Sequence, residues 1–232
     1  YPEGKQYTPY IYTVDELAKF FAEIDKDKRR CSYACPYRRQ IMSVIFRMFY
    51  MCGLRLSEAR LLKVADVDLE KGVLTILHSK KDNSRLVAMS DSLTERCRTF
   101  SLEVHLLSGA EDYYFPALED KPMSLLYLYQ NFRRFLWRAG ISHGGRGRGP
   151  PRIHDFRHTY AVHCLKKWAE QEKDLTAYLP ILKTYMGHYS FEETAYYLRM
   201  TADVFPHITL KLETHYLNII PQLEGGTNDE TY

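Results

Sequence analysis

The 232-residue sequence has no long hydrophobic run and no strong excess of charge of either sign. No apolar stretch approaches the ~20 residues of a membrane-spanning helix, and residues 1–5 (Tyr-Pro-Glu-Gly-Lys) lack the apolar core of a signal peptide. Thirty-two Lys and Arg against 29 Asp and Glu leave a net charge of only +3, which identifies no polyanionic partner by itself. We therefore expect a soluble, cytoplasmic protein with no membrane partner.

Cysteine is scarce and carries no pattern. The five cysteines are odd in number and irregularly spaced: Cys31, Cys35, Cys52, Cys97 and Cys164. This spacing argues against a disulfide framework and favours a reducing compartment. No Cys-x-x-Cys pair of a zinc site is present, so we expect no bound metal.

Helical signals dominate the first part of the chain. Thr13-Val-Asp-Glu16 is a capping box that opens a helix to about Ile24, because the Thr hydroxyl and the Glu carboxylate satisfy free amides. A second helix is predicted from Pro36, ending at Gly53, which suits a left-handed C-terminal position. A third short helix follows near Leu56 to Leu62.

After residue 62 the spacing of apolar residues changes from a helical pattern to short runs typical of β-strands. Gly72–Leu77 and Arg85–Met89 are short β-type runs on either side of a polar turn, which predicts a hairpin. Ser92 and Glu95 form a second capping box for a helix to Leu107. Further helices are predicted at Ser124–Ala139, Asp155–Ala169, Pro180–Met186, Phe191–Arg199 and Pro206–Ile219.

These elements predict an α+β fold that is mainly helical, with helices around a small antiparallel sheet or hairpin. Residues 1–12 have a linker-like composition, and residues 13–223 form the domain, with a last helix at about 206–220. We expect residues 224–232 to be a disordered tail.

Three local patterns stand out by their order and spacing. They are Gly53-Leu-Arg55-Leu-Ser-Glu58, then His154-Asp-Phe-Arg157-His158, and last Met186-Gly-His188 with Tyr197 nine residues further on. Together they resemble the catalytic domain of the tyrosine recombinases, the phage-integrase family, over roughly residues 10 to 220. The resemblance implies an enzyme of DNA integration or excision of a mobile element. Such an enzyme cleaves and rejoins strands through a 3′-phosphotyrosine, with no metal or cofactor.

Arg55 follows Gly53 at an expected helix start, where free amides and the positive end of the helix dipole favour an anion. Its guanidinium can grip a phosphate through two parallel bonds, and the resemblance gives it the scissile phosphate. The alternative is a surface pair with Glu58, worth less than about 1 kcal/mol. We expect Glu58 itself to orient Arg55.

His154 and Arg157 are three residues apart, so on a helix their side chains share one face. The resemblance makes Arg157 the second phosphate clamp and His154 a proton-transfer or hydrogen-bonding group. In the alternative interpretation His154 only caps the helix. His158 lies about 100° round the helix from Arg157, and we expect it to be a packing residue.

The resemblance places a general-acid lysine at Lys80, although the usual Gly-Lys-Gly is here Ser79-Lys80-Lys81. A lysine in a turn is otherwise simply solvated. His188 belongs to the Gly-His pair that the family directs at a non-bridging phosphate oxygen, and a helix-end histidine near the carbonyls is the alternative.

Tyr197 is the predicted nucleophile. Helical spacing sets Thr194 and Tyr197 on one face and turns Tyr196 about 100° away. Tyr196, and Tyr216 in the last helix, remain the alternatives. A phenol with a pKa near 10 needs cations to stabilise its phenolate, and metal-free phosphoryl transfer needs the same cations at the phosphate oxygens.

Double-stranded DNA is the expected partner. Six arginines could line a phosphate-binding stripe or simply be solvated: Arg133, Arg134, Arg138, Arg146, Arg148 and Arg152. The resemblance also implies a homo-tetramer on DNA in which the helix at 206–220 docks on a neighbouring protomer, with packing on its own domain as the alternative.

Two other functions stay open at this stage. A type IB topoisomerase-like enzyme shares the chemistry but reseals the same strand. A catalytically silent DNA-binding regulatory module would use only the basic surface, and the full set of Arg55, Lys80, His154, Arg157, His188 and Tyr197 argues against it.

Overall fold

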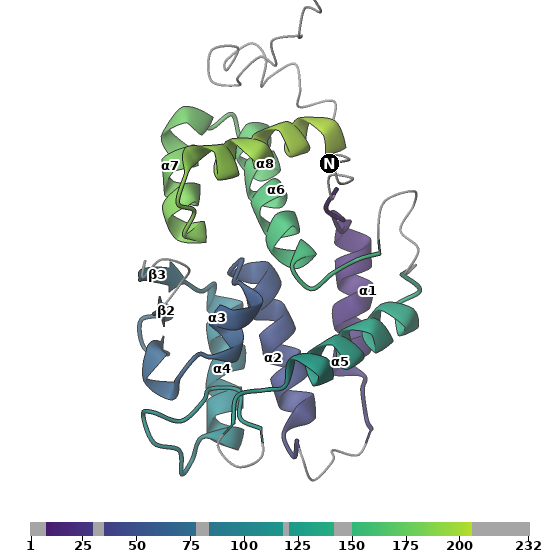
Figure 1. The fold of residues 1–232 in the computed structure, drawn as a ribbon, viewed down its shortest axis with the longest axis vertical. Helices are drawn as coiled ribbons and strands as arrows, with labels where there is room; N and C mark the ends of the chain where they lie inside the picture. The colour runs from purple at the N-terminus through teal and green to yellow at the C-terminus, as the bar shows by residue number, and fades with distance from the viewer. Residues whose placement is uncertain (1–7, 30–34, 78–83, 118–120, 142–149, 206–232) are drawn as a thin grey trace, which may run out of the picture.

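The computed structural model describes residues 8–29, 35–77, 84–117, 121–141 and 150–205 (Figure 1). Its helices are α1 (Val14–Asp25), α2 (Arg38–Met51), α3 (Leu56–Arg60), a 3₁₀ turn (Val64–Asp66), α4 (Asp91–Val104), α5 (Leu125–Arg138), α6 (Asp155–Glu170), α7 (Leu175–Met186) and α8 (Phe191–Val204). The strands are β1 (Val67–Asp68), β2 (Val73–Ile76) and β3 (Arg85–Ala88). The predicted fold class, mainly helical with a small antiparallel sheet, is confirmed.

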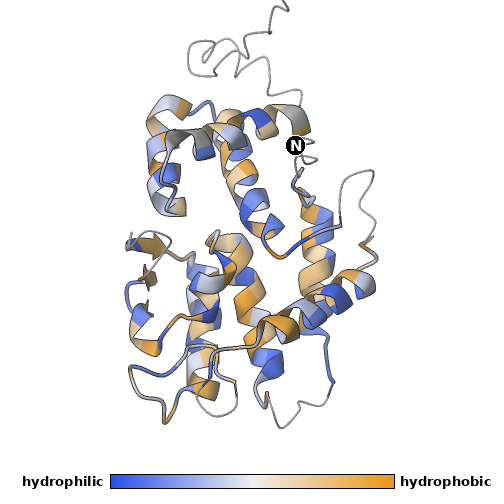
Figure 2. Ribbon diagram, in the orientation of Figure 1, coloured by the Kyte–Doolittle hydropathy of each residue, from blue (hydrophilic) through white to orange (hydrophobic). Residues whose placement is uncertain are grey.

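The helices form two groups that meet at the middle of the molecule (Figure 1). The first five helices and the sheet enclose one core, in which Phe20 packs against Phe46, Phe132 and Phe156. The last three helices enclose a second core. Apolar and polar residues alternate around the helices as an amphipathic pattern requires (Figure 2), so each helix turns one stripe inward. α6 joins the two groups.

The predicted start of α1 is confirmed. The Glu16 amide donates to Thr13 Oγ1 over 3.2 Å, and the Thr13 amide donates to Glu16 Oε2 over 2.9 Å. The second predicted capping box, at Ser92, is wrong. α4 begins two residues earlier, with Ser90 as its cap, because the hydroxyl of Ser90 is the one that accepts from the backbone amide of Leu93.

α7 begins five residues before the predicted start at Pro180, so that prediction is wrong. Asp174 caps the helix by accepting the Thr176 amide over 2.9 Å, and Pro180 lies inside it. A buried stripe fixes this longer helix, consisting of Leu175, Leu179, Leu182 and Met186. α8 likewise runs past the predicted end at Arg199, and its N-cap residue Ser190 makes no side-chain capping bond.

The sheet has the antiparallel order β1-β2-β3, with Val73 opposite Ala88 and Ile76 opposite Arg85. It therefore contains the predicted hairpin strands and one further two-residue strand. Along β3 the inward positions are Arg85 and Val87, both buried. A buried arginine at the edge of a small sheet requires a partner with negative charge.

Part of the expected linker belongs to the core. Tyr12 is fully buried, its ring stacks on Phe156 with centroids 4.8 Å apart, and its amide donates to Thr159 Oγ1 over 3.1 Å. The expected last helix at 206–220 and the expected tail at 224–232 lie outside the described residues. None of the helices described is both long and apolar enough to cross a membrane.

Candidate active site

Five of the six predicted site residues come together where the two groups of helices meet. Arg55 precedes α3, His154 and Arg157 begin α6, His188 lies in the turn between α7 and α8, and Tyr197 is on α8. The sixth, Lys80, lies outside the described residues. Segments more than a hundred residues apart in sequence thus share one site.

Arg157 is the central residue of this site. Its side chain is almost fully enclosed, and its Nη1 and Nη2 donate over 2.5 Å to the carbonyls of Gly53 and Met186. Burial, followed by the charge of Arg55, lowers the pKa of Arg157 to about 10, so the guanidinium stays charged at neutral pH. One side chain thereby joins the ends of α2 and α7.

The two glycines of the sequence patterns are required by this close approach. Gly53 has a φ of +58°, and a Cβ there would lie 2.9 Å from the Tyr160 ring. Gly187 has a φ of +65°, and a Cβ there would lie 2.8 Å from Nη1 of Arg85. Both positions combine a left-handed backbone with no space for a side chain, as the prediction for Gly53 anticipated.

Arg55 reaches across the site from the other side. Its Nη1 donates to Glu58 Oε1 and its Nη2 to the Gly187 carbonyl, both over 2.8 Å. The Arg55 amide donates to the carboxylate of Glu58, at Oε2, over 2.8 Å. The alternative of a surface pair is wrong, because the Glu58 side chain is only 2% exposed. Glu58 orients Arg55, as predicted.

Glu58 is ionised in spite of its burial. Burial alone would raise its pKa, but hydrogen bonds and charge from Arg85 and Arg55 lower the pKa to about 2. Arg55 and Arg85 bind this carboxylate, and the guanidinium of Arg157 is close enough to interact with its charge. The resulting excess of positive charge in a half-enclosed site suits a phosphodiester anion.

The two histidines of the site are neutral. Burial, followed by the charges of Arg157 and Arg55, lowers the pKa of His188 to about 3 and that of His154 to about 4, although His154 as a whole residue is exposed. His154 stands at the N-cap position of α6 but makes no capping bond. The His188 Nδ1 lies 2.9 Å from Thr194 Oγ1 rather than at a helix carbonyl. Neither alternative of a merely capping histidine is supported.

Tyr197 is buried within this group, at 3% exposure, and its ring stacks on His188. Burial raises the pKa of Tyr197 to about 12, even though the charge of Arg157 lowers it. Tyr196 is 38% exposed and meets Tyr197 only edge to face. The predicted common face of Thr194 and Tyr197 exists, since both contact His188. His158 packs against Tyr197, as expected.

Sequence reasoning missed Arg85. The pattern of β3 treated it as the first residue of a hairpin strand, yet its side chain bonds both oxygens of Glu58. The alternation of side chains along the strand could have indicated that Arg85 points inward, because it falls on the same face as the apolar Val87. An arginine on an inward strand face must meet a buried anion.

The predicted basic stripe is in part a set of internal ion pairs. Arg134 and Arg138 lie 3.0 Å and 3.5 Å from Asp27 Oδ1, and Arg38 bonds the other oxygen of Asp27 over 2.5 Å. Arg133 and Arg152 are exposed, and Arg146 and Arg148 lie outside the described residues. Arg134 and Arg138 therefore hold α5 against the end of α1.

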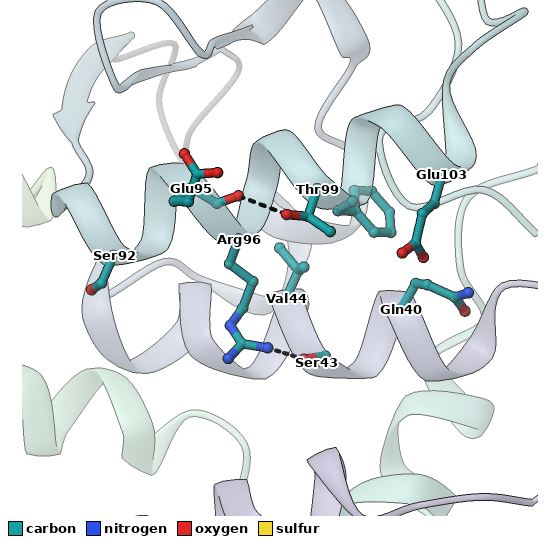
Figure 3. Close-up of a pocket in the computed structure, with 9 residues that line it drawn as sticks. Gln40, Ser43, Val44, Ser92, Glu95, Arg96, Thr99 and Glu103 are labelled. Carbon is teal, nitrogen blue, oxygen red and sulfur yellow. Dashed lines mark hydrogen bonds between the residues drawn. The ribbon is translucent and has the colours of Figure 1, made fainter.

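A cavity of about 510 Å³ between α2 and α4 is separate from this site (Figure 3). Polar side chains line most of it, and Arg96 donates to Ser43 Oγ across it over 2.8 Å. No candidate site residue lines it. Within the described ranges, no three His, Cys, Asp or Glu residues are grouped as metal ligands.

Clustered arginines, neutral histidines and a buried tyrosine define a site for phosphate chemistry. The model of the phage integrase family matches residues 12–203, so the chain belongs to that family, as the resemblance predicted. It is 31% identical over 216 residues to a Sinorhizobium fredii protein named as the integrase/recombinase y4rB, covering 91% of this chain and 68% of that protein. It is 26% identical over 234 residues to the tyrosine recombinase XerA of Pyrococcus furiosus, covering 97% and 68%.

Solved structures show the same fold. A crystal structure of XerA recombinase has a TM-score of 0.67 at 20% identity, covering 92% of this chain and 65% of that one. XerH in a post-cleavage complex with its difH substrate has a TM-score of 0.65 at 23% identity, covering 88% and 54%. The catalytic domain of bacteriophage HP1 integrase has a TM-score of 0.55 at 20% identity, covering 93% and 100%. The predicted catalytic-domain fold is confirmed.

Proposed function

We propose that the chain is the catalytic domain of a site-specific recombinase that cleaves and rejoins double-stranded DNA during integration or excision of a mobile element. The observation that carries this proposal is the convergence of Arg55, Arg157, His188 and Tyr197 from four separate segments. The excess of guanidinium charge beside a buried phenol is what a phosphodiester substrate and a tyrosine nucleophile require. The chain works in the cytoplasm, where its DNA substrate lies.

Tyr197 is the proposed nucleophile. Its Oη forms a bond to phosphorus while the bond from phosphorus to the 5′-oxygen breaks, which leaves a 3′-phosphotyrosine and a free 5′-hydroxyl. Arg55 and Arg157 stabilise the charge on the non-bridging oxygens, and His188 donates a hydrogen bond to one of them. Both arginines retain N–H groups for this, since Arg55 donates two of its five in the described contacts, and Arg157 donates two to carbonyls and one to Tyr197.

Two groups move protons in this scheme. His154 is neutral, so it can accept the phenol proton as the anionic phosphate raises its basicity. Lys80, in the role that the family resemblance gives it, protonates the leaving 5′-oxygen. Attack of a 5′-hydroxyl from another strand reverses both transfers and rejoins DNA without ATP, because the phosphotyrosine conserves the bond energy.

We also propose that four copies assemble on DNA and exchange the segment at 206–220. A groove of about 390 Å³ supports this, since apolar residues that include Ile11, Val204 and Phe205 line one part of it. The charged side chains of Lys166, Lys167 and Glu170 line another part. The groove lies beside Phe205, the last described residue, and its apolar part is a suitable binding surface for the apolar face of a helix. The solved XerH neighbour is described as bound to its difH substrate, which supports DNA as the partner here.

The decisive experiment is covalent trapping. The chain is incubated with short nicked duplexes of randomised sequence, and adducts are separated on a denaturing gel and their DNA is sequenced. We expect a protein–DNA adduct that is lost on protease treatment. If the chain binds DNA but forms no adduct with any sequence in the pool, the proposed function is wrong and the chain is a catalytically silent DNA-binding module. Adduct formation with relaxation of plasmid DNA but no exchange between duplexes would favour the topoisomerase-like function.

A further inference from the structure

Arg85 connects three parts of the active site although it belongs to none of the sequence patterns. It opens β3, and its side chain is only 6% exposed. Its Nη1 donates to Glu58 Oε1 over 2.9 Å and its Nη2 to Glu58 Oε2 over 2.8 Å. Its Nε donates to the Tyr185 carbonyl near the end of α7, also over 2.8 Å. All three kinds of guanidinium nitrogen are thus used.

These bonds complete the coordination of Glu58. Each carboxylate oxygen accepts one bond from Arg85 and one from Arg55, the latter through Nη1 and the backbone amide. A carboxylate held by a two-bond fork cannot rotate freely, and Arg55 is oriented by that same carboxylate. The direction of the Arg55 guanidinium therefore depends in part on how firmly Arg85 holds Glu58, together with the bond to the Gly187 carbonyl.

Arg85 also shapes the turn that carries His188. A Cβ on Gly187 would lie within 3.0 Å of three atoms of the Arg85 side chain, so the guanidinium lies directly against this turn. The Gly187 carbonyl in turn accepts from Arg55 Nη2 over 2.8 Å. Arg85 thus contacts Glu58, which binds Arg55, and also Gly187, which precedes His188.

From this geometry we infer that Arg85 is a positioning residue for strand cleavage, acting through Glu58 on Arg55 and through the Gly187 turn on His188. The inference rests on the proposed function. Small displacements of catalytic groups cost much in rate, so the effect of losing Arg85 belongs in the chemical step rather than in DNA affinity. Arg85 commits three of its five N–H groups to protein acceptors, among them both carboxylate oxygens of Glu58.

The chain offers a matched control. Arg38 is also a buried arginine paired with a buried carboxylate, that of Asp27, but it lies at the start of α2, and neither it nor Asp27 contacts a candidate site residue in the described bonds. Arg38→Met removes the same charge from a comparable environment. A purely structural role predicts that Arg85→Met and Arg38→Met behave alike.

The test measures three quantities for both variants: the melting temperature by circular dichroism, the dissociation constant for a nicked duplex that the unchanged chain cleaves, and the single-turnover cleavage rate at saturating DNA. We expect Arg85→Met to cleave about 10- to 100-fold more slowly, with a dissociation constant within about threefold of the unchanged value. Arg38→Met should cleave at nearly the unchanged rate at a temperature where it is folded. Arg85→Lys should recover part of the rate, since it restores charge without the fork.

A double-mutant cycle tests the route through Glu58. If Arg85 acts through that carboxylate, adding Arg85→Met to Glu58→Gln should lower the rate by less than the product of the single effects. Unchanged cleavage by folded Arg85→Met, equal losses in Arg38→Met, or fully multiplicative effects would overturn the inference. So would failure of both Arg85 variants to fold while Arg38→Met folds. Absence of any adduct with the unchanged chain would instead overturn the proposed function.

Discussion

The rings of His188 and Tyr197 lie nearly parallel, 12° apart in plane and 5.5 Å between centroids. The imidazole is fixed on its other edge by Thr194, which comes from the same helix as the tyrosine. Any displacement of α8 therefore moves Tyr197, the proposed nucleophile, together with Thr194, which holds His188. A phosphate between His188 and Arg157 would meet the Tyr197 phenol in a constant geometry.

Tyr197→Phe should abolish the covalent adduct while DNA affinity stays within about threefold, because one hydroxyl is lost and the phosphate-binding cations remain. Adduct formation on nicked duplex is measured on a denaturing gel, and affinity by fluorescence anisotropy. Tyr196→Phe is the matched control and should form adduct normally. An adduct with Tyr197→Phe, or its loss in Tyr196→Phe, would show that the nucleophile is another tyrosine.

Arg55→Ala should lower the single-turnover cleavage rate by about 10²- to 10³-fold, because it removes a fixed donor to the transition-state phosphate. Arg157→Lys should have a similar effect, since one ammonium cannot keep both the Gly53 and Met186 carbonyls and also bind phosphate. Arg47→Ala, which breaks a pair with Asp25 away from the site, is the control. Near-normal cleavage in either active-site variant would contradict the phosphate-clamp roles.

Gly187→Ala should destabilise the fold more than Gly140→Ala. Both glycines have positive φ, of +65° and +69°, so each substitution carries a backbone cost of about 1 to 2 kcal/mol. At Gly187 the new Cβ also meets the Arg85 guanidinium, whereas at Gly140 nothing lies within 4 Å. The difference in urea-unfolding free energy should be at least about 1 kcal/mol. An equal loss of unfolding free energy in the two variants would mean that the Arg85 side chain can move away from the new Cβ without cost.

Stability should fall as pH decreases from about 6.5 toward 4. Burial and nearby positive charge lower the pKa of His154 to about 4 and those of His158 and His188 to about 3. His105 and His163 shift in the same direction. The unfolded chain, with ordinary histidine pKa values near 6.5, therefore binds more protons in this window, which favours unfolding. The lowered pKa of Glu58 adds its own loss only below about pH 4.5.

Urea-unfolding free energies at pH 7.5, 6.5, 5.5 and 4.5 would measure this dependence. His158→Gln should flatten the curve in proportion to the one proton that it removes, provided that the variant folds. A free energy of unfolding that is constant across the window would contradict the neutral state of these buried rings.

Removal of residues 206–232 should impair strand exchange between two duplexes by at least about 10-fold and leave binding to one duplex nearly unchanged, since contacts between protomers multiply weak affinities. All of the candidate site residues precede the cut. Removal of residues 224–232 alone is the control and should have little effect. Equal loss of binding and exchange in the longer deletion would count against exchange of this segment.

Local signals predicted most of the helices, and the errors have physical causes. Thr13 and Glu16 are close in sequence and define their helix start without outside help. Pro180 misled the prediction of α7 because proline favours the first turn, while the buried stripe beginning at Leu175 sustains the helix around it. Two-residue β1 has too little pattern to be visible in sequence and exists only through its pairing with β2.

The site residues also divide into those with a local sequence signal and those without one. Arg157 and Tyr197 could be predicted as site residues because each falls within a local pattern of fixed spacing. Arg85 could not, because its importance comes from Glu58, 27 residues away, and from a turn 100 residues away. The pairing of Arg134 and Arg138 with Asp27 was missed for a similar reason, since a basic stripe looks the same in sequence with or without a distant carboxylate.

The bonds from Arg157 to the carbonyls of Gly53 and Met186 make the assembly of the site depend on helices from both groups. A nascent chain that has completed only the first group of helices presents Arg55 and Glu58 but has neither α7 nor the tyrosine of α8. The guanidinium becomes fixed only when both helix ends are in place. The complete set of site residues is therefore brought together only when α7 and α8 have packed against the first group of helices.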